Sequence, residues 1–182
     1  MHPLPLLSVS HTETLEALPM DLSKEARILS HLRLNARLGL TDLSKATGIP
    51  VSTIFDQLKT TPHIRRYSTL LDFNSLGFGC RALVLCRTTK ESKPALGNYL
   101  CRHPYVNTLH KVNNGYDFCL EGVFRDLKHL EDFLEHLDES FSLRAKEIHY
   151  LLDELSREGF LLDPAQAHAT ILGKAGHPRT TE

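Results

Sequence analysis

The residues with the clearest chemical potential lie in a polar stretch between positions 52 and 59. A glutamine can pair with adenine through two hydrogen bonds, and an aspartate can accept a hydrogen bond from cytosine. Small hydroxyl side chains at the start of such a stretch would face phosphates or base edges. We therefore expect nucleic-acid contacts from one helix that presents Ser52, Thr53, Phe55, Asp56, Gln57 and Lys59.

Further polar residues flank this stretch on both sides. Arg65 and Arg66 would bind phosphate, which positions a protein on a duplex without reading its sequence. Thr41 is expected at the start of the preceding helix, which would hold the reading helix against the backbone. Residues 51–60 contain one Lys, one Asp and no Arg. The alternative is therefore a three-helix packing unit that contacts no nucleic acid.

The elements that would position these residues can be predicted from apolar spacing. A first helix follows Ser23, with Ala26, Leu29, Leu32 and Ala36 on one face and Ile28 beside it. A second, shorter helix follows Thr41 and stops at Gly48. A third runs from about Val51 to Thr60, with Ile54 and Leu58 facing inward, and Pro62 ends it. The extended-favouring segment 63–73 predicts a hairpin, and together these elements would form a winged helix-turn-helix.

The second half of the chain follows a different pattern. Strands are expected at 80–89, 106–112 and 116–124 and from 145 onward, with helices at 94–103 and 126–140. This β-α-β-β-α-β order predicts a ferredoxin-like antiparallel sheet with two helices on one face, so the fold class is α+β. Apolar residues on both sides of the strands indicate that a second copy covers the other face, as a homodimer.

Composition is consistent with a soluble globular protein, at 41% apolar and 24% charged residues over 182 positions. Residues 21–72 hold eight Lys/Arg against five Asp/Glu, whereas residues 73–163 hold eleven against fourteen. A polyanion would therefore meet the first part. The chain start lacks the features of a signal peptide, and no apolar run is long enough to cross a bilayer, so we expect a cytoplasmic protein.

Neither the cysteines nor the histidines have the spacing of a metal site. The four cysteines form no Cys-x-x-Cys pair, and we interpret them as reduced, largely buried side chains. The eleven histidines are interpreted as solvated surface residues. We expect no metal, no cofactor and no catalytic residue. The predicted organisation is a flexible arm at 1–20, a winged helix-turn-helix at 21–72, a ferredoxin-like domain at 73–163 and a flexible tail at 164–182.

Several motifs in order resemble the leucine-responsive/asparagine-regulatory (Lrp/AsnC) transcription regulators. The resemblance covers roughly residues 22–160, although this chain has Pro50-Val51 where the family usually has Ser-Pro. It implies a DNA-binding regulator with a dimerisation and effector domain, modulated by a small metabolite. The matching residues are Ile28-Leu29, Leu32, Asn35-Ala36-Arg37, Leu43, Gly48 and Ser52-Thr53-Ile54, then the segments 67–84 and 113–137.

The resemblance also implies a place for the effector. Family members bind small molecules, commonly amino acids, near a glycine-bearing loop, which corresponds here to Asn113, Asn114, Gly115, Tyr116 and Asp117. The Asp117 carboxylate would receive an α-ammonium group; alternatively it caps a turn and stays solvated. Two other functions remain open. One is a siroheme decarboxylase-like enzyme of the same architecture, with His110 near the tetrapyrrole carboxylates, and the other is a ligand-sensing paralogue that no longer binds DNA.

Overall fold

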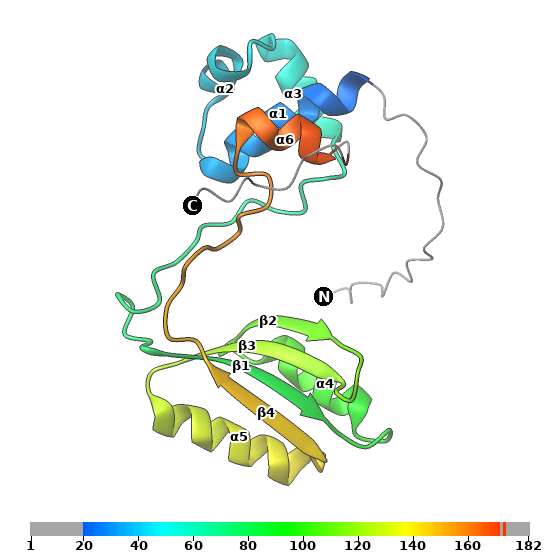
Figure 1. Ribbon diagram of the computed structural model, residues 1–182, viewed down its shortest axis with the longest axis vertical. Coiled ribbons are helices and arrows are strands. Elements are labelled where there is room, and N and C mark those ends of the chain that lie inside the picture. The colour runs from blue at the N-terminus through cyan, green and yellow to red at the C-terminus, as the bar shows by residue number, and fades with distance from the viewer. Residues whose placement is uncertain (1–19, 172, 174–182) are drawn as a thin grey trace, which may run out of the picture. The chain divides into compact units, whose positions relative to one another are not determined.

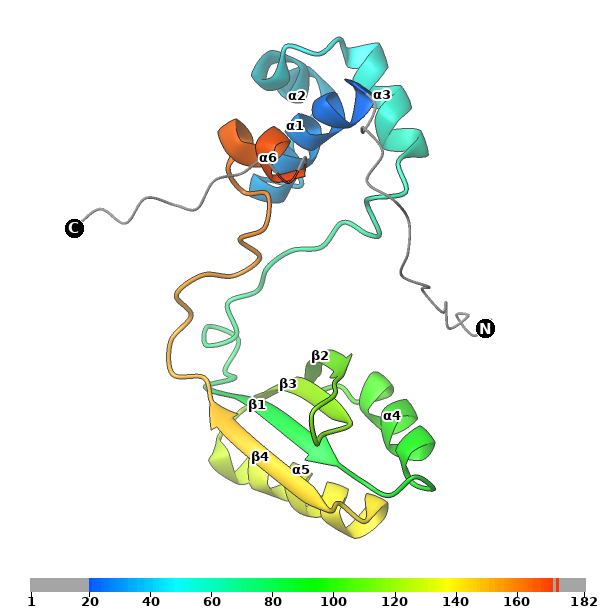
Figure 2. The same cartoon turned by 45° about the vertical axis from the view of Figure 1, so that its right-hand side comes forward.

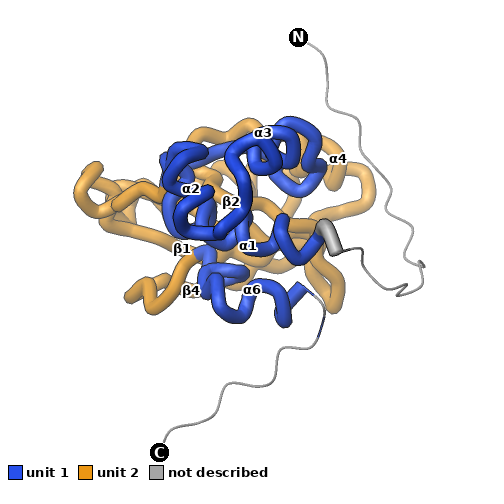
Figure 3. Tube along the Cα trace, turned by 90° about the horizontal axis from the view of Figure 1, so that it is seen from above, with its two compact units in different colours: residues 1–69, 158–182 blue, residues 70–157 orange. Residues whose placement is uncertain are grey.

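The computed structural model describes residues 20–171 and residue 173, with side chains described from residue 22 onward. The predicted arm at 1–20 lies outside these residues, apart from the first helical position at Met20. The described chain forms two compact units (Figure 3). The first combines the residues up to 69 with those from 158 onward, and the second contains residues 70–157. Among the described helices, none has the length and apolarity that crossing a bilayer requires.

In the described part of the first unit, the regular secondary structure consists of helices: α1 (Met20–Leu34), α2 (Leu40–Thr47), α3 (Val51–Thr60) and α6 (Pro164–Ile171) (Figure 1). Its core contains Ile28 and Leu32 from α1, Leu43 from α2, Ile49 from the turn and Ile54 from α3, with Leu58 packed against them. The inward face predicted for the third helix is therefore confirmed. The packing of these apolar side chains against one another holds the three helices together as a helix-turn-helix.

Helix α1 is buried on two sides rather than one. Ile28 and Leu32, four residues apart, face the core of α2 and α3. Ala26 and Ser30 are also fully buried, yet they lie on a different side of the helix, since a residue turns through about 100°. Helix α6 packs against α1, and its Ala167 is buried as well. Small residues let the two helices approach closely, and this second face explains the blurred periodicity of the sequence.

The predicted flexible tail is wrong for residues 164–171, because they form α6. Asp163 initiates this helix by accepting a hydrogen bond from the backbone N–H of Ala165 at 2.9 Å. The segment before it is tied to α1, since Arg33 donates to Glu158 at 2.9 Å and to the carbonyl of Phe160 at 3.1 Å. Residues 158–163, assigned by sequence to the second domain, therefore pack with the first unit.

The predicted hairpin after α3 is also wrong. Residues 61–72 contain no strand. Within the described part of the chain, residues 64–71 make no backbone–backbone hydrogen bond. A strand needs a neighbour to accept its hydrogen bonds, and the β-favouring residues of this segment have none. Tyr67, Leu70 and Leu71 are accordingly more than half exposed.

The second unit has the predicted ferredoxin-like fold. Its strands are β1 (Cys80–Arg87), β2 (Val106–Lys111), β3 (Phe118–Phe124) and β4 (Ala145–Tyr150), and its helices are α4 (Lys93–Arg102) and α5 (Leu127–Phe141). The strand order is β2-β3-β1-β4, with every neighbouring pair antiparallel. Asp126 begins α5 by accepting a hydrogen bond from the backbone N–H of His129 at 2.8 Å, as the sequence predicts.

Both helices cover the same face of this sheet (Figure 2). The covered face carries alternate residues of the central strands, such as Val84 and Leu120, which are fully buried. Leu83, Leu85 and Cys119 point to the opposite face, which no helix of the unit covers, and they remain half-buried. The sheet thus has one finished core and one partly apolar open face.

Candidate nucleic-acid interface and ligand loop

Helix α3 presents one row of side chains to solvent. Ser52, Phe55, Asp56 and Lys59 are all exposed, and Phe55 keeps 53% of its surface accessible. These positions recur every three or four residues, on the side opposite the buried Ile54. The row therefore combines a hydroxyl, an aromatic ring, a carboxylate and an ammonium group, all predicted from sequence.

Two of the predicted contacts are less accessible. Thr53 and Gln57 are only half-exposed, and the side-chain oxygen of Gln57 is buried. Gln57 therefore presents less of its amide to a base edge than the sequence suggests. Thr41 is exposed in the first turn of α2, although the helix begins one residue earlier, after Gly39.

The turn between α2 and α3 is held by a compact set of hydrogen bonds. Gly48 adopts a left-handed conformation with φ of 70°, and its N–H donates to the Ser44 carbonyl at 2.8 Å. The buried hydroxyl of Thr47 donates to Leu43 O at 2.6 Å and accepts from Ile49 N at 3.3 Å. Arg27 of α1 donates to the Thr47 carbonyl. These bonds fix the direction in which α3 leaves the turn.

The start of α3 has no side-chain cap. Its N-cap residue is Pro50, which has no hydroxyl or carboxylate to offer the first-turn N–H groups. The first N–H groups of a helix have no intrahelical acceptor, and the helix dipole makes that end partly positive. The departure from the usual Ser-Pro start therefore leaves backbone donors available to an external anion such as a phosphate.

The basic residues beside α3 are not neutralised by the protein. Arg65 and Arg66 are exposed, as is Lys59. In the part of the chain that the structure describes, none of the three forms an ion pair. Their charges are therefore available to a polyanion.

The loop between β2 and β3 has the backbone predicted for it. Asn114 and Gly115 both have positive φ, at 59° and 97°. Asn113, Asn114 and Gly115 are exposed, whereas Tyr116 and Asp117 are half-buried. Asparagine and glycine tolerate this left-handed conformation, so the loop turns tightly without strain.

The Asp117 carboxylate is neither solvated nor open to a ligand, because both of its oxygens accept hydrogen bonds from other residues. Its Oδ1 accepts a hydrogen bond from Lys93 Nζ at 2.5 Å, and its Oδ2 accepts one from the backbone N–H of Thr88 at 3.0 Å. The bond from Lys93, followed by that from Thr88, lowers the pKa of Asp117 from its ordinary value of 3.8. A ligand ammonium group would have to displace Lys93 to bind this carboxylate.

Tyr116 turns toward the open face of the sheet instead. Its hydroxyl donates to Glu147 of β4 at 2.8 Å, and this bond raises the pKa of the phenol. His149 of the same strand lies 2.8 Å from the other oxygen of Glu147. Tyr116 and Asp117 therefore bind different elements of the unit: Tyr116 contacts β4, and Asp117 contacts the start of α4.

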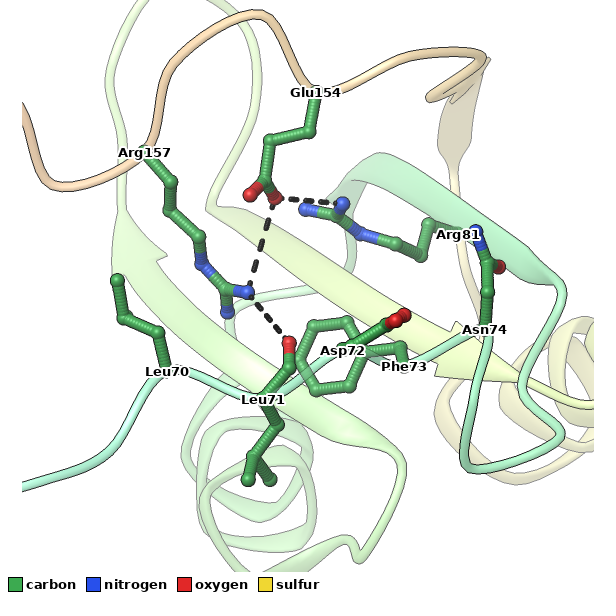
Figure 4. Close-up of a pocket in the computed structure, with 8 residues that line it drawn as sticks. All are labelled: Leu70, Leu71, Asp72, Phe73, Asn74, Arg81, Glu154 and Arg157. Carbon is green, nitrogen blue, oxygen red and sulfur yellow. Dashed lines mark hydrogen bonds and ion pairs between the residues drawn. The ribbon is translucent and has the colours of Figure 1, made fainter.

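A second group of residues, which sequence patterns did not indicate, lines a shallow cavity of about 320 Å³ (Figure 4). Phe73 lies against two guanidinium groups, with Arg157 at 4.8 Å and Arg81 at 5.4 Å from the ring centroid. Glu154 lies 2.8 Å from Arg81 and 3.7 Å from Arg157. Arg157 also donates to the Leu71 carbonyl at 3.4 Å.

The charges in this cavity are already matched. Arg81 is shared between Glu154 and Glu121, the latter at 2.7 Å. The bonds join the segment before β1 to the segment after β4, both within the second unit. The two arginines therefore hold residues 71–73 in place, and neither has an unpaired charge that could bind a ligand.

The described residues contain no group of three or more His, Cys, Asp and Glu side chains that could hold a metal ion. All four cysteines are free thiols. Burial is the main cause that raises the pKa of Cys86 to about 12, so this thiol stays protonated and inert at neutral pH.

Comparison with known families identifies the second unit. A family model described as the Lrp/AsnC ligand binding domain matches residues 81–159. Residues 81–159 are thus similar to the Lrp/AsnC ligand binding domain. The family resemblance and the fold class predicted from sequence are thereby confirmed. The matched segment ends before α6 begins at Pro164.

Curated relatives extend the likeness beyond the segment that the family model matches. An uncharacterized HTH-type transcriptional regulator of Pyrococcus abyssi is 24% identical over 74% of this chain and 93% of its own length. The HTH-type transcriptional regulator FL11 of Pyrococcus horikoshii is 22% identical over 64% of this chain and 79% of its own.

Solved structures share the fold. A transcriptional regulator of Neisseria meningitidis, solved in complex with L-Met, has a TM-score of 0.69 at 20% identity and covers 78% of this chain and 94% of its own. LrpC of B. subtilis has a TM-score of 0.67 at 16% identity and covers 78% of this chain and 99% of its own. Each of these two alignments leaves about a fifth of this chain uncovered.

Proposed function

We propose that this chain is a cytoplasmic, DNA-binding transcription regulator of the Lrp/AsnC type. The observation that carries the proposal is the exposed row of α3 on a helix-turn-helix, joined to an Lrp/AsnC ligand binding domain. An α-helix fits the major groove of DNA, and the helix before it rests on the backbone. In this proposal Phe55, Asp56 and Lys59 meet base edges, with Gln57 at the margin of the contact.

Phosphate contacts would come from three sources. The open N–H groups at the start of α3 would supply the first, and the exposed hydroxyls of Thr41 and Ser52 the second. Arg65 and Arg66 would add two cationic contacts, which strengthen binding to any sequence by releasing counterions. The family relatives named as HTH-type transcriptional regulators support this assignment.

The second unit would form a homodimer and sense a small metabolite. Leu83, Leu85 and Cys119 supply apolar area on the open face of the sheet, where a second copy would complete a core. An amino-acid effector near residues 113–117 is supported by the L-Met complex of the N. meningitidis protein. Because Asp117 is bound to Lys93, the effector would meet Asn113, Asn114 and Tyr116 first. Ligand would act by favouring one assembly of dimers over another.

Selection of binding sites from random DNA with the purified protein tests the proposal. We expect an enriched motif with two related half-sites about one helical turn apart, since a symmetric dimer presents two recognition helices. Failure to enrich any sequence, together with no retention of duplex DNA at low salt, would show that the chain has lost DNA binding.

The two arginines that follow α3 are tested by salt dependence. Replacing Arg65→Ala with Arg66→Ala should weaken binding to all sequences and lower the slope of log K against log salt by about two. The control pair, Arg102→Ala with Arg144→Ala, removes two exposed arginines from the second unit and should leave the slope unchanged. Equal slopes for parent and R65A/R66A would exclude these arginines as phosphate contacts.

The proposal assigns no catalytic residue. The siroheme decarboxylase-like alternative depends on His110, which is exposed on β2 and points to the open face of the sheet. Incubation of the purified chain with siroheme should leave both the absorbance spectrum and the tetrapyrrole unchanged. Appearance of a decarboxylated product would replace the regulator with the enzyme.

A further inference from the structure

Glu25 of α1 reaches across the first unit to the segment that follows α3. Its Oε1 accepts a hydrogen bond from the hydroxyl of Thr61, the residue that ends α3. The Nδ1 of His63 lies 2.8 Å from the same oxygen, and the His63 backbone N–H donates to the Thr61 hydroxyl at 3.2 Å. The Glu25 side chain is only 16% exposed. We call Glu25, Thr61 and His63 the α1–α3 latch.

The latch lies immediately before the two arginines proposed to bind phosphate. Arg65 and Arg66 follow His63 by two and three residues. From residue 64 to 71 the described chain has no backbone–backbone hydrogen bond, so little beyond this point sets its direction. Ile64, the residue after His63, packs against the helix-turn-helix core. The latch and this one apolar contact therefore determine where the arginines are presented.

A carboxylate is a costly choice at this position. The unit is proposed to approach a polyanion, and a negative charge next to the contact repels it. If Glu25 acted only through its charge, DNA binding would be stronger without it. Fixing a flexible segment before binding has the opposite effect, because less conformational freedom is lost when the complex forms.

We propose that Glu25 is a positioning residue for DNA binding, which orients Arg65 and Arg66 through Thr61 and His63. The inference rests on the proposed function and adds a residue to it. Glu25 itself touches no DNA in this account. Its effect on affinity is indirect and passes entirely through the two arginines.

Replacement of Glu25 gives opposite signs for the two roles. In Glu25→Ala, loss of positioning should weaken DNA binding by about threefold to tenfold and lower the salt slope toward that of R65A/R66A. Loss of charge alone should strengthen binding. The matched control is Glu158→Ala, which removes an acidic partner of Arg33 from the same unit and should not weaken binding.

A double-mutant cycle then shows whether the effect passes through the arginines. Adding Glu25→Ala to R65A/R66A should cost nothing further, whereas independent effects would add. Thr61→Ala removes the hydroxyl that joins Glu25 to the His63 backbone, leaves the charge unchanged and should weaken binding. Thr61→Ser keeps the hydroxyl and should bind as the parent does. Thermal unfolding confirms that each variant is folded at the binding temperature.

The outcomes separate this inference from the proposed function. If the parent binds DNA and Glu25→Ala binds equally well or more tightly, only the positioning role is overturned. Additive effects in the cycle, or weak binding by Thr61→Ser, overturn it as well. If the parent binds no DNA under any salt condition, the proposed function itself falls, and the positioning role falls with it.

Discussion

Asp117 joins three parts of the second unit through one carboxylate. It holds Lys93 at the start of α4 and the backbone of Thr88 just beyond β1, while it closes the loop that precedes β3. Its own N–H donates to the Cys86 carbonyl at 2.9 Å. The residue predicted to receive a ligand therefore has a structural role that shapes the ligand loop.

Replacing Asp117→Asn should lower stability at neutral pH by about 1–3 kcal/mol, because a charge-assisted hydrogen bond to Lys93 is lost. The pKa of Asp117 is lowered in the folded state, so its stabilisation is present above the unfolded value, near 3.8, and disappears as pH falls through the folded value. Urea unfolding at pH 7 and at acid pH measures the difference between variant and parent.

The control is Asp132→Asn, which breaks an exposed pair with Lys128 at 3.0 Å and should change stability little at either pH. A stability difference for Asp117→Asn that persists unchanged in acid would mean that packing, rather than charge, is responsible.

At the scale of elements, α4 and α5 meet through a cluster of rings. His103, at the end of α4, lies 4.8 Å from the Phe133 ring and 5.1 Å from the Tyr99 ring. His136 is 5.5 Å from Tyr99. Burial lowers the pKa of His103, and the charges of His136 and then His129 lower it further. The interpretation of these histidines as ordinary solvated residues does not hold for His103.

Acidification should therefore weaken the packing of these helices. The folded state favours neutral His103, so its stabilisation is complete above the ordinary pKa of 6.5 and is lost as pH falls below that value. His103→Gln should reduce the loss of stability between pH 8 and pH 5, measured by urea unfolding. His168→Gln, at an exposed position on α6, is the control and should preserve the parent pH profile. Identical profiles for parent and His103→Gln would contradict the prediction.

At the scale of the whole molecule, the proposed homodimer would form through the open face of the sheet. Leu85→Lys should shift this proposed homodimer toward monomer, because two lysines would be buried near each other at the interface. Analytical ultracentrifugation measures the shift. Leu127→Lys, at a position 58% exposed on α5, is the matched control and should leave the mass unchanged. A dimer that survives Leu85→Lys would place the interface elsewhere.

The second whole-molecule prediction concerns α6. A chain ending at Arg157 should lose protection from hydrogen exchange in α1, because the buried face of Ala26 and Ser30 becomes exposed. Protection in β1 and β3 should persist, since their core lies in the other unit. A chain ending at Gly173 retains α6 and should match the parent. Unchanged protection of α1 without α6 would show that the contact contributes no stability.

Local patterns were sufficient to predict much of the fold. The alternation of Phe118 and Leu120 with Cys119 gave the correct faces of β3, and the spacing of Ile54 and Leu58 gave the inward side of α3. Asp126 gave the start of α5. Each of these patterns extends over only a few neighbouring residues, so it can be recognised in the sequence without knowledge of the tertiary structure.

Other features depend on residues far apart in the chain, and local patterns do not reveal them. Lys93 and Asp117 are 24 residues apart, Glu25 and His63 are 38 apart, and Arg33 meets Glu158 across 125. The hairpin predicted after α3 is wrong because β-propensity alone cannot supply a neighbouring strand. The row on α3 was predicted except for the partial burial of Gln57, which depends on the tertiary environment of the helix.

The return of the chain to its first unit has a consequence for biosynthesis. Helices α1, α2 and α3 are made before α6, so α1 lacks its packing partner until α6 has been translated. The whole sheet unit is made in between. The nascent helix-turn-helix therefore stays incompletely packed while the sheet unit is made, and its packing is completed only after α6 has been translated.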